Sequence, residues 1–238
     1  MMNPYEKLLN RKRKWTPVPM TAGTCREGTE ETISRALALR HMELPVGDFI
    51  TDALANDVPD VARELLESNV RDETNHDVAL GFVAAAYGVD EKAEAEAIRL
   101  RNAWISHPDH TIAKAMVAER SIFFVLLPFF RAHGTAGMRT VSADISRDEQ
   151  IHVATNSLVC RELGLDISPS LDKLRLATIN WVMQPLGRST VRTLNKQTWL
   201  DASDNLMYQG KAPELSFTRS ARMPAFFEHD ARNLPQYA

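Results

Sequence analysis

The chain has 238 residues, of which 44% are hydrophobic and 25% charged, and its formal net charge is -3. These values are typical of a soluble globular protein, and so small a charge gives no reason to expect nucleic acid or an anionic membrane as a partner. Two cysteines are too few for a disulfide framework or a thiolate zinc site. The longest apolar run, 122–130, is too short to span a membrane, so we expect a cytoplasmic protein without a membrane span.

Residues 1–27 are predicted to form an extended N-terminal segment, because they contain three prolines and show little periodicity. Apolar residues at helical spacing then predict four long helices over 29–55, 60–87, 111–131 and 138–163. Thr29 is expected to cap the first helix, and Pro45 is expected to kink or interrupt it. Gly88 and Gly164 are expected to end the second and fourth helices.

A shorter helix is predicted over 91–105, and two more over 168–183 and 189–207. The last residues, 210–238, are polar, contain three prolines and lack helical periodicity. No pattern indicates strands. We therefore predict an all-α fold with a single domain over 1–238. In it, 29–163 form a four-helix core, 168–207 add extra helices, and 210–238 form an irregular C-terminal tail.

Two segments share the pattern Asp-Glu-x-x-His, at 72–76 and 148–152. Residues three apart lie on one face of a helix, so the Glu and His of each motif can reach the same metal ion. A carboxylate together with an imidazole suits iron or manganese. A single motif of this kind arises easily by chance. A repeated spacing strengthens the prediction of a metal site, because Glu43 lies 30 residues before Glu73 and Glu119 lies 30 residues before Glu149.

Four helices thus supply a possible two-metal site. We predict six ligands, which are Glu43, Glu73, His76, Glu119, Glu149 and His152. Asp48 is the competing ligand on the first helix, because Pro45 makes the local register uncertain. Glu119 has apolar neighbours, where a carboxylate is costly unless it is protonated, paired or bound to metal. The alternative for Glu119 is an ion pair with Arg120 or with another helix.

The acids that precede each motif are predicted to support the ligands. A metal-bound imidazole usually donates its second N–H to a carboxylate or a carbonyl. We therefore expect Asp72 to hold His152 and Asp148 to hold His76. The alternative is that both acids are exposed to solvent. An apolar chamber beside the ions is predicted to be lined by Leu80, Ile122, Phe123 and Phe124.

With these motifs, the chain resembles the ferritin-like di-iron carboxylate superfamily, and within it the radical-generating small subunit of class I ribonucleotide reductase. The stretches 119–124 and 146–152 carry the resemblance, whereas the first two helices match only in ligand spacing. In that family a radical tyrosine lies one helical turn after the first metal-binding histidine. Leu80 occupies that position here, so a tyrosyl radical at the usual place is not expected.

The resemblance implies two iron ions, or one manganese and one iron, as cofactors. It also implies an oxidoreductase that activates O2 to oxidise a small organic substrate or to form a protein radical. Two alternatives stay open: a reductase small-subunit-like protein without the usual tyrosine, and a non-enzymatic iron-binding protein. A homodimer, an electron donor or a larger partner protein also stay open. Aromatic residues available for such a contact are Trp15, Phe226, Phe227 and Tyr237.

Overall fold

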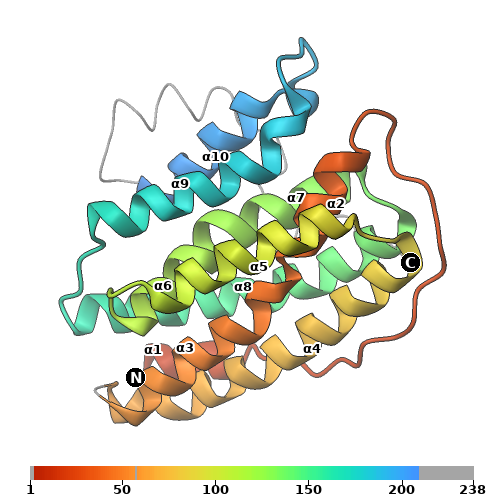
Figure 1. The fold of residues 1–238 in the computed structure, drawn as a ribbon. Helices are drawn as coiled ribbons and strands as arrows, with labels where there is room; N and C mark the ends of the chain where they lie inside the picture. The colour runs from red at the N-terminus through yellow and green to blue at the C-terminus, as the bar shows by residue number, and fades with distance from the viewer. Residues whose placement is uncertain (1–2, 57, 209–238) are drawn as a thin grey trace.

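A computed structural model describes residues 3–56 and 58–208, and in this part of the chain it contains helices and no strand (Figure 1). The all-α prediction is confirmed for these residues. The central helices are α3 (Glu43–Ala55), α4 (Arg63–Tyr87), α6 (Thr111–Ala118), α7 (Phe124–His133) and α8 (Ala136–Glu162). Helix α3 packs against α4 and α6, and α8 packs against α4, α6 and α7, so that together they enclose one hydrophobic core.

The first predicted helix is divided in the structure. Helix α2 (Glu30–Ala38) is followed by a 3-10 turn over Leu39–Met42, and α3 begins at Glu43. Pro45 therefore lies in the first turn of α3, where its missing N–H costs no hydrogen bond. The prediction that Thr29 caps the helix with its side chain is wrong, because the Thr29 hydroxyl donates to the carbonyl oxygen of Arg26 at 2.6 Å.

The N-terminal segment is not extended throughout, contrary to the prediction for 1–27. Residues Pro4–Leu9 form a short helix, α1, which packs against α4 and α8. Asn3 caps it, since its side chain accepts a hydrogen bond from the backbone N–H of Tyr5. Residues 12–26 contain no helix. This stretch carries side chains that reach α4 and α8, as described below.

The third predicted helix contains an irregular turn. Helix α6 ends at Ala118, a π-helical turn covers Glu119–Phe123, and α7 continues to His133 with Pro128 inside it. A π turn accommodates one extra residue in the helix, and such turns often occur at functional sites. The turn begins at Glu119, one of the predicted ligands.

Further helices cover one side of this core (Figure 1): α5 (Glu91–Ser106), α9 (Pro169–Met183) and α10 (Lys196–Tyr208). Single 3-10 turns cover Asp60–Ala62, Gln184–Leu186 and Arg192–Leu194. These outer helices are connected with one another: Trp104 on α5 donates to the Thr178 hydroxyl on α9 at 3.0 Å, and the fully buried Arg175 on α9 donates to Asp204 on α10 at 2.7 Å. Helix α10 begins later than the predicted 189, because a turn at Gly187 and the side-chain cap of Asn195 precede it.

Glycines end the two longest helices, as predicted. Gly88 follows α4 with φ of 87°, and Gly164 follows α8 with φ of 64°, a backbone conformation that glycine adopts without strain. Within residues 3–56 and 58–208, none of the helices has the length and apolar character needed to cross a bilayer.

Candidate metal centre

The six predicted ligands meet in the middle of the core. Glu43 lies at the start of α3, Glu73 and His76 lie on α4, Glu119 opens the π turn, and Glu149 and His152 lie on α8. All six are buried, and none exposes more than 2% of its surface. Gly47 lies where α3 faces this part of α4, since a Cβ atom there would be in van der Waals contact with the side chain of Glu73 at 3.4 Å. Asp48, the competing ligand on α3, is exposed and lies outside the cluster.

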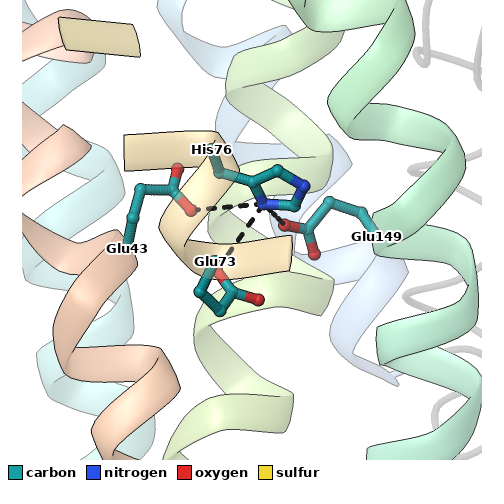
Figure 2. A group of neighbouring side chains, drawn as sticks. All are labelled: Glu43, Glu73, His76 and Glu149. Carbon is teal, nitrogen blue, oxygen red and sulfur yellow. Dashed lines mark ion pairs between the residues drawn. The ribbon is translucent and has the colours of Figure 1, made fainter. Parts of the chain in front are cut away.

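One group of carboxylates surrounds His76 (Figure 2). The Nδ1 atom of His76 lies 3.4 Å from Glu149 Oε1, 3.6 Å from Glu73 Oε2 and 3.7 Å from Glu43 Oε2. These four residues come from three helices, and one atom of each lies within 4.8 Å of the others. We call them the His76 ligand set.

A second group surrounds His152. Its Nδ1 atom lies 2.8 Å from Glu73 Oε1, 3.7 Å from Glu119 Oε1 and 3.9 Å from Glu149 Oε2. Glu73, Glu119 and His152 again offer atoms within 4.8 Å of one another, and we call them the His152 ligand set. Glu73 belongs to both sets, and Glu149 lies near both histidines through different oxygens. The two imidazole rings stack with centroids 5.6 Å apart. The two ligand sets therefore lie side by side, share Glu73, and could each hold a metal ion.

The outer nitrogens of both histidines face the two predicted aspartates. His152 Nε2 lies 3.1 Å from Asp72 Oδ2, and His76 Nε2 lies 3.4 Å from Asp148 Oδ2. The aspartate of each motif thus contacts the histidine of the other motif. With a cation bound, a carboxylate that accepts the Nε2–H would leave the lone pair of Nδ1 free to coordinate the ion. Both aspartates are buried, which contradicts the alternative of solvent-exposed acids.

The N-terminal segment completes the surroundings of the aspartates, which the sequence patterns do not predict. Trp15 Nε1 donates to Asp148 Oδ2 at 2.6 Å, and Arg13 Nε lies 3.6 Å from Asp148 Oδ1. On the other side, the ammonium of Lys12 forms an ion pair with Asp72. The basic run at 11–14, followed by a tryptophan, is the one signal in the sequence that could have indicated such contacts.

Glu119 has a partner that was also not predicted. The side-chain amide of Asn156, one turn after His152 on α8, donates to Glu119 Oε2 at 2.6 Å. Arg120, the predicted alternative partner, instead donates to the carbonyl oxygen of Leu206 at 2.7 Å. Glu119 Oε1 remains directed towards His152. The π turn and Asn156 thus orient one oxygen of Glu119 into the cluster.

Burial shifts the ionisation of the cluster. It raises the pKa of Glu43, Glu119 and Glu149 above the usual range, and nearby carboxylates add to the effect. Burial acts in the same direction on Glu73, but the two histidines outweigh it and lower its pKa. Burial alone would lower the pKa of His152, whereas Glu73 and Asp72 raise it to about 10. Protons therefore compensate the buried negative charge when no cation is bound.

The unpartnered atoms of this cluster provide the test of fit to a metal. Buried polar atoms normally form hydrogen bonds, yet eight atoms here form none, although the two Nδ1 atoms lie 2.8 to 3.9 Å from glutamate oxygens. They are Glu43 Oε2, both oxygens of Glu73, His76 Nδ1, Glu119 Oε1, both oxygens of Glu149, and His152 Nδ1. All belong to the six predicted ligands and include the atoms that converge around Nδ1 of each histidine. The residues present therefore fit two cations with carboxylate and imidazole ligands.

The predicted apolar residues lie in the core around these helices. Leu80, Ile122 and Phe123 are buried, and Phe124 is half-buried. The aromatic residues Phe226, Phe227 and Tyr237 lie outside the described residues.

Comparison with protein-family models, with curated proteins and with solved structures finds no match.

Proposed function

We propose that the protein is a di-metal carboxylate oxidoreductase that activates O2 to oxidise an organic substrate. One observation carries the proposal: the atoms left without hydrogen-bond partners belong to two ligand sets, each with one imidazole, that share Glu73. Nitrogen and carboxylate ligands in this mixture favour iron, or one manganese and one iron. Bound ions of this kind would supply the redox chemistry for reducing O2, as they do in the ferritin-like di-iron carboxylate proteins that the sequence resembles.

The chain's own residues would perform three tasks in this reaction. The carboxylates of Glu43, Glu73, Glu119 and Glu149 would balance the positive charge of the ions. Asp72 and Asp148 hold the outer N–H of each imidazole and so fix the orientation of both rings. Apolar side chains such as Leu80 and Phe123 exclude water from the surrounding core, which limits side reactions.

Metal content and oxygen reactivity test this function. Protein purified from cells supplied with iron and manganese is expected to contain two ions per chain, and His152→Ala should lose at least one of them. After anaerobic loading with Fe(II), addition of O2 should oxidise the iron faster than in Glu119→Ala. Glu67→Ala changes an exposed residue on α4 and serves as the matched control. Equal oxidation rates in the wild type and Glu119→Ala would refute the proposal.

A second candidate function is a relative of the reductase small subunit that delivers a radical or an electron to a larger protein. The continuous chain of contacts from Trp15 through Asp148 to His76 favours it, because it connects the N-terminal segment with a ligand. Leu80 stands where that family has its radical tyrosine, so the radical would need another location. Co-purification with a catalytic large subunit, together with an electron paramagnetic resonance signal after oxygen exposure, would support this function over the first.

A further inference from the structure

The two aspartate–histidine pairs have different charged neighbours. The ammonium of Lys12 lies beside the pair of Asp72 and His152. It forms an ion pair with Asp72 and lies 3.4 Å from His152 Nε2. It also donates a hydrogen bond to Asn69 Oδ1 at 2.9 Å. The Lys12 side chain is only 9% exposed. A positive charge is therefore held, nearly out of solvent, against the outer side of the His152 ligand set.

Among residues 3–56 and 58–208, no ammonium makes an equivalent contact with the pair of Asp148 and His76. Trp15 donates a neutral N–H to Asp148, and Arg13 reaches the same carboxylate only at 3.6 Å. The Arg13 guanidinium also binds Asp144 at 2.9 Å, and its side chain is 28% exposed, so solvent screens its charge more strongly. The His76 ligand set thus experiences less positive charge from the N-terminal segment.

The ligands themselves add to this difference. The His76 ligand set has three glutamates, whereas the His152 ligand set has two, and Asn156 occupies one oxygen of Glu119. Lys12 also competes with His152 for Asp72, which weakens the pull of that carboxylate on the imidazole proton. A weaker pull makes Nδ1 a poorer donor to a cation. Each effect lowers cation affinity at the His152 ligand set.

We propose that Lys12 is a positioning residue that makes the two metal positions unequal, so that the His76 ligand set fills first and the His152 ligand set fills with lower affinity. This inference rests on the proposed function only in that both ligand sets must bind a cation. It adds which ligand set binds its cation more tightly, and it attributes the difference to the charge of Lys12 acting through Asp72 and His152.

Anaerobic titration with Mn(II), followed by calorimetry and by the paramagnetic resonance signal of free Mn(II), tests this inference. The wild type should bind two ions in steps that differ at least about tenfold in affinity. Lys12→Met keeps the length of the side chain without its charge, and should tighten the second step by about tenfold. Lys12→Arg keeps the charge and should behave as the wild type. Lys14→Met removes an exposed lysine of the same segment and is the matched control.

Asp72→Asn provides a test with the opposite sign. It leaves the ammonium of Lys12 without its counter-charge beside His152, so the second step should weaken. If the ion pair had only a structural role, Lys12→Met and Asp72→Asn would change the affinity of the second step in the same direction. That result would overturn the inference. An unchanged second step in Lys12→Met would overturn it as well. Absence of Mn(II) and Fe(II) binding in the wild type would instead refute the proposed function itself.

Discussion

Replacement of Glu119 by glutamine is expected to stabilise the metal-free protein and to destabilise the metal-loaded one relative to the wild type. The ligand atoms of the His152 set lie within 4.8 Å of one another. Two unit negative charges at that separation repel each other by about 3.5 kcal/mol at an effective dielectric constant of about 20. Glutamine has the same shape, can accept the Asn156 hydrogen bond with its oxygen, and places an N–H group where Glu119 Oε1 now lies.

The size of the gain depends on pH, because protons already relieve part of the repulsion. The pKa of Glu119 is raised by burial, so the folded wild type retains a proton that the unfolded chain loses above the usual glutamate pKa. The wild type therefore loses stability as pH rises from that value towards the raised one. We expect Glu119→Gln to gain about 1–3 kcal/mol at pH 8 and less at pH 5.5.

Thermal unfolding of metal-free protein, prepared with a chelator, measures this gain. The melting temperature of Glu119→Gln should exceed that of the wild type by about 2–12 °C at pH 8. With saturating Mn(II) the order should reverse, because the amide is a poorer ligand than the carboxylate. Glu67→Gln, on the exposed side of α4, should stay within about 0.5 kcal/mol of the wild type. A lower melting temperature of metal-free Glu119→Gln at pH 8 would contradict the expected relief of charge repulsion.

Four further predictions concern the centre and the core. Mn(II) should raise the melting temperature of the wild type more at pH 8 than at pH 6, because cations must displace protons from ligands whose pKa values are raised, among them His152; an equal shift at both pH values would contradict this. Trp15→Phe should lower the free energy of unfolding in urea by about 1–2 kcal/mol, since Asp148 loses the donor at 2.6 Å. Leu80→Tyr should lower the same free energy of unfolding by about 1–3 kcal/mol, because a larger side chain enters a buried position. If the ions activate O2, this variant should also give a tyrosyl signal in paramagnetic resonance that the wild type lacks. Trp104→Ala should lower the free energy of unfolding by about 3–5 kcal/mol, because this ring on α5 is fully buried and donates to Thr178 on α9.

Several elements of the centre follow from the sequence because they depend on local periodicity. Glu73 and His76 share a helix face by their spacing alone, and the same holds for Glu149 and His152. The repeated offset of 30 residues, between Glu43 and Glu73 and again between Glu119 and Glu149, equals the length of a helix and a turn. The contacts of Asp72 with His152 and of Asp148 with His76 could be predicted because a pseudo-twofold site requires them.

Other elements could not be predicted, because they depend on contacts between distant residues. Lys12 reaches Asp72 across 60 positions, and Trp15 reaches Asp148 across 133, from a segment without periodicity. The π turn at Glu119 leaves no mark in the sequence pattern, since residues 112–130 are apolar at most positions and a shift of one residue leaves such a pattern unchanged. The late start of α10 has a local cause instead, because the turn at Gly187 and the cap at Asn195 interrupt an otherwise helical pattern.

The order of the ligands along the chain has a consequence for synthesis on the ribosome. Three members of the His76 ligand set lie between Glu43 and His76, in α3 and α4, whereas the His152 ligand set is complete only when α8 has emerged. At about 5–20 residues per second, translation from residue 76 to residue 152 takes on the order of ten seconds. During this interval three of the four residues of the His76 ligand set have been synthesised, and Glu149 follows on α8. If both ligand sets bind cations, as proposed, a first ion would meet two carboxylates and one imidazole of its site before His152 is made.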